Sequence, residues 1–201
     1  MKKIICLVSI LMLVMTVSAQ VTWNVKAGVG AAWCSLSDYD DPSSKTHVVG
    51  KFGVGMELPL SADFSLMPSL ELALKGANVD FQELSDTFNQ KLNFTFLQLP
   101  VMGAYRFNMS DRLNMVLKAG PYIAYGLSGK LKEDGESWDI YAGDEDIDSA
   151  KRLDIGAIIG VDFEINRFVV GVEYEHGFTN LSPTEAGIKN RAVYVTVGYK
   201  F

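Results

Sequence analysis

Apolar and polar residues alternate with a two-residue period in eight segments of this chain, and helical spacing is weak throughout. The last segment reads RAVYVTVGYKF and places three valines, Tyr199 and Phe201 on one face. In water, a strand with such an apolar face would be prone to aggregate, whereas the same apolar residues are compatible with a lipid bilayer. The alternation therefore predicts an all-β protein and favours an outer-membrane β-barrel. The eight segments are about 21–33, 47–60, 64–78, 93–107, 112–127, 152–164, 167–177 and 191–201.

The first twenty residues predict an export signal. The basic pair Lys2-Lys3 precedes an almost wholly apolar run over residues 4–17, and Val17-Ser18-Ala19 supplies the small residues that a signal peptidase needs. The run is shorter than the roughly 20 residues of a transmembrane helix. We expect residues 1–19 to be a cleaved signal peptide and residues 20–201 to form one barrel domain.

Charge and cysteine content narrow the classes of protein that fit. Without Lys2 and Lys3 the chain has 16 basic and 24 acidic residues, a formal charge of −8, and no basic cluster, which argues against nucleic-acid binding. Cys34 is the only cysteine after the signal, so no intrachain disulfide is expected. The sequence suggests no cofactor. No apolar run long enough for a spanning helix remains, so entry into a membrane requires a closed barrel.

The links between the segments alternate in length. Tight turns near 60–64, 107–112 and 165–167 fall between long polar links near 34–46, 79–92, 128–151 and 178–190. Short periplasmic turns and longer external loops are typical of outer-membrane barrels. We therefore expect an eight-stranded, antiparallel, up-and-down transmembrane β-barrel in the bacterial outer membrane, with both termini periplasmic.

The two faces of the segments differ chemically. One phase is apolar over long runs, while the other carries charged side chains interleaved with glycines, which suits a narrow lumen in which each charge needs a partner and room to reach it. The predicted lumen charges are Lys26, Lys51, Glu57, Glu71, Lys75, Arg106, Arg112, Lys118, Arg152, Asp154, Asp162, Glu164, Glu173, Glu175 and Lys200.

Aromatic residues of the apolar phase predict two membrane-interface girdles. Trp23 and Trp33 are ten residues apart, about 25 Å along the axis of a tilted barrel, which matches the usual apolar band. Ordinary core packing remains an alternative for any single aromatic residue. The predicted interface residues are Trp23, Trp33, Phe64, Phe107, Tyr125, Phe163, Phe168, Tyr199 and Phe201.

A secreted soluble barrel of the lipocalin type is the main structural alternative. It would use the same alternation with the apolar phase turned inward, and periodicity alone does not say which face is inside. Glycines in the charged phase, short turns at one end and terminal Phe201 favour the membrane barrel.

Several short motifs resemble the PorT-type outer-membrane β-barrel family. They are Met67–Ala77 (MPSLELALKGA), Phe96–Val101 (FLQLPV), Tyr105–Phe107 (YRF), Lys26–Gly30, Lys118–Tyr122 and Gly198–Phe201. Ser69 replaces the acidic residue usual in the family, and Phe96 replaces its tyrosine. The resemblance implies the barrel fold; the secretion role behind the family name is not carried over on these residues.

Three functions fit such a barrel. Eight strands leave a lumen just wide enough for side chains to fill, so a plugged interior with a structural or surface-interaction role is favoured. A narrow porin-like channel for small solutes is the alternative. A lipid-modifying enzyme at the outer rim comes third, because His47 and His176 form no compact motif with a serine, and we expect no catalytic residues.

The link over residues 128–150 is strongly acidic, with a net charge of −6. Asp144, Asp146 and Asp148 match the opening of a calcium loop, but the glycine and the final glutamate are missing, so they form a weak calcium candidate. A solvated acidic loop and a partner-binding loop with Trp138 and Tyr141 as anchors are the alternatives. The predicted partners are outer-membrane lipid and lipopolysaccharide, the barrel-insertion machinery through the strand ending at Phe201, and an extracellular partner at loop 128–150.

Overall fold

The computed structural model describes residues 21–36, 44–83, 86–133, 136–139, 152–180 and 188–201. Among these residues it has ten strands and no helix long and apolar enough to cross a membrane. Two strands, β2 (Ser44–Lys45) and β7 (Glu136–Asp139), are short. The eight long strands are β1 (Thr22–Leu36), β3 (His47–Pro59), β4 (Phe64–Glu83), β5 (Asp86–Ser110), β6 (Leu113–Glu133), β8 (Leu153–Ile165), β9 (Phe168–Gly177) and β10 (Ile188–Lys200).

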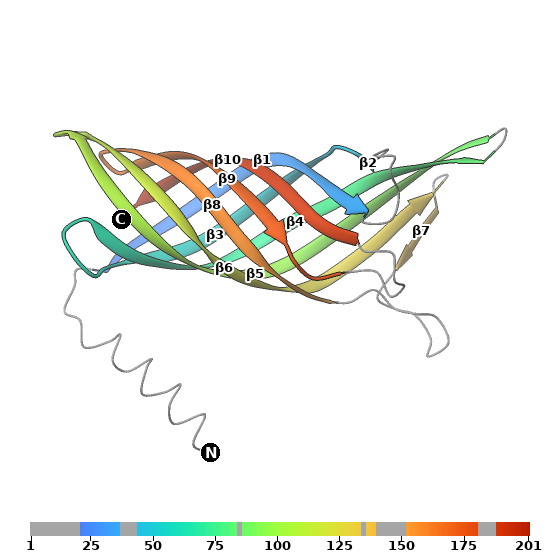
Figure 1. Cartoon of the computed structure of the whole chain (residues 1–201), viewed down its shortest axis with the longest axis horizontal. Helices are drawn as coiled ribbons and strands as arrows, with labels where there is room; N and C mark the ends of the chain where they lie inside the picture. Colours follow the sequence, from blue (N-terminus) through green and yellow to red (C-terminus); the bar gives the residue numbers. More distant parts are fainter. Residues whose placement is uncertain (1–20, 37–43, 84–85, 134–135, 140–151, 181–187) are drawn as a thin grey trace, which may run out of the picture.

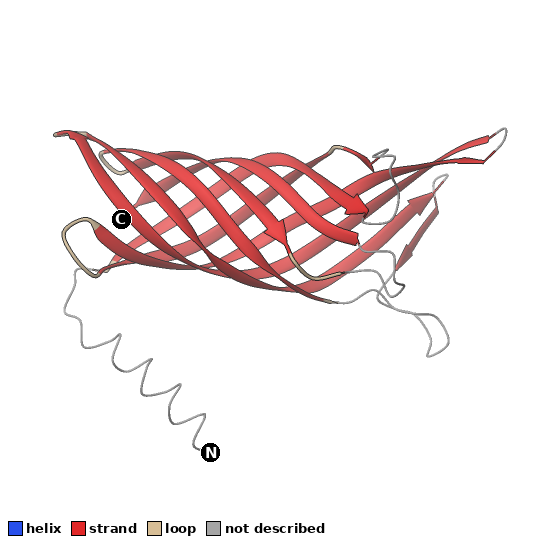
Figure 2. Ribbon diagram, in the orientation of Figure 1, coloured by secondary structure: helices blue, strands red, loops and turns tan. Residues whose placement is uncertain are grey.

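The eight long strands form one closed antiparallel barrel (Figures 1 and 2). Each long strand pairs with the long strands that precede and follow it in the chain, and β1 pairs with β10 to close the ring. Closure leaves no unpaired edge along the wall, so backbone N–H and C=O groups are satisfied without water. The predicted eight-stranded up-and-down barrel is confirmed.

Tight turns gather at one end of the barrel, where β10 also ends (Figure 1). At the β3–β4 turn, the Ser61 hydroxyl accepts a hydrogen bond of 3.1 Å from the Phe64 amide. The β8–β9 turn has two residues between the paired Ile165 and Phe168. Its Asn166 has a φ of 55°, a left-handed conformation that asparagine tolerates and that a two-residue hairpin needs. We call this end the turn end and the opposite end the loop end.

The strands reach further at the loop end than the sequence predicts. The expected link 79–92 is wrong in its extent, because β4 and β5 stay paired up to Glu83 and Asp86 and project beyond the barrel wall (Figure 1). Likewise, β6 continues to Glu133 and pairs with β7 within the expected 128–151 link. Pairing continues because alternating polar and β-forming residues still favour a hairpin there.

The apolar phase faces outward and the charged phase faces the lumen. Val29 is 68% exposed and Ile159 is 60% exposed, whereas Glu173 is 0% exposed. This is the reverse of a water-soluble barrel, in which apolar side chains fill the interior. The soluble lipocalin-type alternative is therefore wrong.

Candidate functional site: two ion networks in the lumen

Nine charged side chains in the middle of the lumen form a continuous set of ion pairs, which we call the central network. Lys51 lies at its centre and forms an ion pair with Glu173. Its Nζ is also 3.1 Å from Glu175 Oε1 and 3.6 Å from Glu71 Oε2. The members are Lys26, Lys51, Glu71, Lys75, Lys118, Asp154, Asp162, Glu173 and Glu175.

Two further lysines join Glu173 to neighbouring carboxylates. Lys26 Nζ is 2.9 Å from Glu173 Oε1 and 2.7 Å from Glu71 Oε1. Lys118 Nζ is 2.7 Å from Glu173 Oε1 and also pairs with Asp162. Glu173 thus has three lysine partners, which offset the cost of burying its charge.

The loop-end side of the network combines ion pairs with hydrogen bonds from neutral donors to its carboxylates. Lys75 Nζ is 3.0 Å from Glu175 Oε2 and 3.6 Å from Asp154 Oδ2. Gln98 Nε2 donates to Glu175 at 3.1 Å, and the Tyr122 hydroxyl donates to Asp154 at 3.1 Å. Lys75 Nζ also lies 4.3 Å from the centroid of the Tyr122 ring, a cation–π contact.

The central network is nearly neutral, and the Lys51 ammonium occupies the place between its glutamates where a metal ion could otherwise bind. It has five carboxylates and four ammonium groups. Carboxylate oxygens of Glu71, Glu173 and Glu175 lie within 4.8 Å of one another, a spacing that could hold a metal ion. The Lys51 ammonium contacts all three carboxylates and supplies the positive charge that a metal would otherwise supply.

Glycines stand opposite the charged side chains and leave space for them. Across the strand pairs, six network residues face a glycine directly: Lys26, Lys51, Glu71, Lys118, Asp162 and Glu173. A Cβ atom on Gly171 would lie 1.9 Å from Asp162 Oδ1, and one on Gly53 would lie 2.7 Å from Glu71 Cγ. The interleaved glycines are therefore a packing requirement of the ion network.

A second, smaller network lies near the turn end, and we call it the turn-end network. Arg106 Nη2 and Lys200 Nζ each lie 2.6 Å from the Glu57 carboxylate. Arg106 Nε is 3.2 Å from Glu164 Oε2, and Lys200 also pairs with Glu164. The Ser65 hydroxyl donates to Glu57 at 2.9 Å. Two cations and two carboxylates balance each other here.

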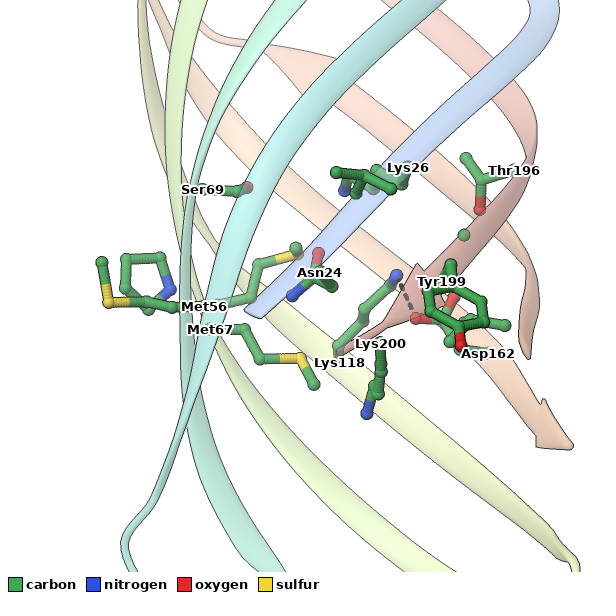
Figure 3. A pocket seen from close by; sticks show the side chains of 15 residues that line it. Asn24, Lys26, Met56, Met67, Ser69, Lys118, Asp162, Thr196, Tyr199 and Lys200 are labelled. Atoms are coloured by element: carbon green, nitrogen blue, oxygen red, sulfur yellow. Dashed lines mark hydrogen bonds and ion pairs between the residues drawn. The ribbon is translucent and has the colours of Figure 1, made fainter. Parts of the chain in front are cut away.

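A cavity of about 40 Å³ lies between the two networks (Figure 3). Lys26, Lys118 and Asp162 border it on the side of the central network, and Lys200 borders it on the other. The volume is enough for about two or three water molecules. Asp162 Oδ1 is buried without a hydrogen-bond partner among the described residues, so water could occupy the side of the cavity next to it, whereas Met56, Met67 and Met102 make much of the remaining lining apolar.

Thirteen of the fifteen predicted lumen charges belong to these two networks. Arg112 and Arg152 are not among the members of either network, as the ion pairs above define them. Both are exposed: Arg112 is in the β5–β6 turn, and Arg152 lies just before β8.

Aromatic side chains that the charge pattern did not reveal complete the filling of the lumen. Phe96, Tyr122 and Tyr194 are among the largest fully buried side chains. The Tyr194 hydroxyl donates to the Leu74 carbonyl at 3.0 Å, and Lys51 Nζ lies 4.6 Å from its ring centroid. Each lies in the inward-facing phase of its strand, and this alternation is the sequence feature that could have predicted their position.

The nine predicted interface aromatics lie on the outer wall. Trp33 and Tyr199 are half-buried by ring contacts: Trp33 is 6.4 Å from Tyr174, and Tyr199 is 5.3 Å from both Phe168 and Phe201. The exposed members are Trp23, Phe64, Phe107, Tyr125, Phe163, Phe168 and Phe201.

The histidines form no catalytic arrangement within the described residues. His176 lies on the outer wall, where its Nδ1 is 3.1 Å from the Tyr174 hydroxyl. His47 is at the start of β3. Neither is bonded to a described serine or cysteine, although a nucleophile and base must lie within hydrogen-bond reach. Asp144, Asp146 and Asp148 lie outside the described residues.

A closed eight-stranded barrel with an apolar outer wall and an ionic interior defines the class of outer-membrane β-barrel proteins. The chain belongs to the family described as "Outer membrane protein beta-barrel domain", which matches residues 18–182. The fold and family support a location in the bacterial outer membrane. No curated protein matches the sequence.

Solved structures with similar folds are distant in sequence. Neisserial surface protein A is 13% identical, with a TM-score of 0.52; the match covers 89% of this chain and 97% of that one. The outer membrane enzyme PagL is 14% identical, with a TM-score of 0.50, and the coverages are 88% and 98%. Ail, the attachment invasion locus protein of Yersinia pestis, is 14% identical, with a TM-score of 0.45 and coverages of 90% and 98%.

Proposed function

We propose that this protein is a non-conducting outer-membrane barrel whose role is structural or interactive and is carried by its loop end. The observation that carries the proposal is the central network. Its nine side chains come from six strands, β1, β3, β4, β6, β8 and β9, and meet in the middle of the lumen. They occupy the path that a solute would need.

The ion pairs make the plug costly to open. A solute crossing the lumen would have to separate Lys51 from Glu173 and Glu175, all of which are buried. Removing one partner of a buried pair typically costs about 3–5 kcal/mol. That cost favours a permanently closed lumen over a channel.

The loop end offers the surface for interactions. The paired β4 and β5 strands, together with β2 and the β6–β7 hairpin, extend the wall there. The acidic link 128–150 follows from the same side, and its excess of carboxylates would attract a basic partner, or lipopolysaccharide through bridging cations, including calcium at Asp144, Asp146 and Asp148.

Membrane insertion completes the proposal. We place the termini and the turn end on the periplasmic side, with the nine outer aromatics in two girdles at the lipid boundary. The strand that ends beside Phe201 would be read by the barrel-insertion machinery. The PorT-type motifs are consistent with this barrel but add no secretion role.

Two other functions follow in order. The cavity beside Lys118 and Lys200 favours a narrow channel over an enzyme as the second candidate, because it provides a short open segment of lumen. A lipid-modifying enzyme at the rim is third, since PagL shares the fold alone.

Single-channel conductance in a planar bilayer tests the proposal. The refolded wild type should be silent, with heat-modifiable gel mobility confirming that it is folded. The double variant Lys51→Ala/Glu173→Ala removes a neutral pair from the centre of the plug and should show conductance, whereas Arg112→Gln, at an exposed turn, should stay silent. Steady conductance of the wild type would make the lumen a channel and refute the plug.

A further inference from the structure

One arginine faces outward from the apolar wall. Val193, Val195 and Val197 alternate along the outer face of β10, and Arg191 continues the same phase toward the loop end. The Arg191 side chain is half-buried, and its Nε is buried with no hydrogen-bond partner in the part of the chain that the structure describes. Nothing among the described residues accepts a hydrogen bond from this Nε, and a charged group on a lipid-facing wall requires a polar partner.

Aromatic residues stand on both neighbouring strands beside this arginine. Arg191 is directly opposite Trp33 on β1 and His176 on β9. Trp33 and Tyr174 stand two strands apart, a separation of about 10 Å along the sheet, yet their ring centroids are only 6.4 Å apart. The two rings therefore lean toward each other across β10. The Phe178 ring continues this frame, 5.4 Å from the His176 ring.

The height of Arg191 on the wall matches the edge of the apolar band. The Phe201 amide donates to the Trp23 carbonyl at 2.9 Å, so these two aromatics mark one level at the turn end. Arg191 is ten residues from Phe201, which is about 25 Å along the axis of a tilted strand, the usual height of the apolar band. Lys189, two residues further on the same face, lies beyond this edge and is half-buried.

We propose that Arg191, with Lys189 beside it, binds the phosphate of an anionic lipid headgroup at the loop-end boundary of the membrane. The planar guanidinium can hold a phosphate through two parallel N–H···O bonds, and the aromatic frame orients it. The acyl chains of the same lipid would lie along Val193 and Val195. Trp33 and Tyr174 then serve as interface anchors on either side of the headgroup.

We expect the site to bind a lipid rather than free phosphate. The cationic group and the apolar wall follow one another along one strand, so they match the headgroup and the acyl chains of a lipid. The site does not depend on whether the lumen conducts, since Arg191 and the central network are on opposite faces of the wall. A silent or a conducting barrel is equally compatible with it.

Native mass spectrometry of the full refolded protein in a non-ionic detergent tests the site with three probes. They are dioleoyl phosphatidic acid, dioleoylglycerol (which lacks the phosphate) and inorganic phosphate (which lacks the chains). The wild type should bind phosphatidic acid at least about tenfold more tightly than dioleoylglycerol, because the binding free energy of hydrogen bonds to a charged group corresponds to at least this factor in affinity. Inorganic phosphate at equal concentration should not displace the lipid.

Matched variants identify the residue. Arg191→Gln should abolish the preference for the phosphate, Arg191→Lys should keep part of it, and Arg112→Gln at the turn end should leave it intact. Heat-modifiable mobility checks that each variant is folded. An unchanged preference in Arg191→Gln, an equal loss in Arg112→Gln, or displacement by inorganic phosphate would overturn the proposal.

Discussion

Replacing Lys51 by methionine tests whether the central network stabilises the barrel through charge. The substitution keeps most of the side-chain length but removes the ammonium that contacts Glu71, Glu173 and Glu175. The network would then have five carboxylates and three ammonium groups, with the three glutamates left within 4.8 Å of one another.

The expected loss of unfolding free energy depends on which lysines still contact the three glutamates. Loss of one member of a buried ion pair costs about 3–5 kcal/mol. Glu71 and Glu173 keep Lys26, and Glu175 keeps Lys75, so we expect the lower end of this range, about 3 kcal/mol. The Lys51 cation–π contact with the Tyr194 ring is lost as well.

Urea unfolding in phosphocholine vesicles, followed by tryptophan fluorescence, measures the free energy of unfolding. The double variant Lys51→Met/Glu173→Gln removes one charge of each sign and should recover at least half of the loss. A loss below about 1 kcal/mol for Lys51→Met, the value typical of a solvent-exposed pair, would refute the reasoning, as would a double variant as unstable as the sum of its parts.

Two further substitutions test the two faces of the wall. Ile159→Arg on the outer face should lower the free energy of unfolding in vesicles by about 2–4 kcal/mol if the residue faces mid-bilayer lipid, and a cost near zero would reverse the assignment of the faces. Gly171→Ala would place its Cβ 1.9 Å from Asp162 Oδ1 and should cost about 1–3 kcal/mol by forcing Asp162 from its position. Gly50→Ala, whose Cβ would meet nothing closer than 3.5 Å, is the control, and equal costs at both glycines would contradict the packing argument.

The alternation of residues was enough to predict the strands because a barrel wall separates lipid from lumen at every position. Ile159 and Glu173 each take the side that their polarity dictates, without any knowledge of their neighbours. The extent of the β4–β5 hairpin could not be predicted in this way. Beyond the membrane both faces meet water, so the polarity of residues 79–92 does not mark where pairing stops.

The contacts inside the lumen could not be predicted either, because they depend on how the strands are aligned with one another. The sequence places Lys118 and Glu173 in the same phase, but only the register shows that both stand opposite Gly160. Buried Tyr122 and Tyr194 were missed because an aromatic residue is compatible with either face. Arg191 was not recognised as a site because a single charged residue in the outward phase is typical of the end of a strand.

The ion pairs of the lumen join residues that are far apart in the chain. Lys26 and Glu173 are separated by 147 positions, and Lys200 and Glu57 by 143. Neither pair can form while the first and last strands are apart, so an unclosed sheet would carry unneutralised charges on one face. Assembly should therefore be cooperative and slow, as expected for such non-local contacts. The inner face must stay in contact with water until β1 meets β10, and closure of the ring is the step that makes the protein compatible with its membrane.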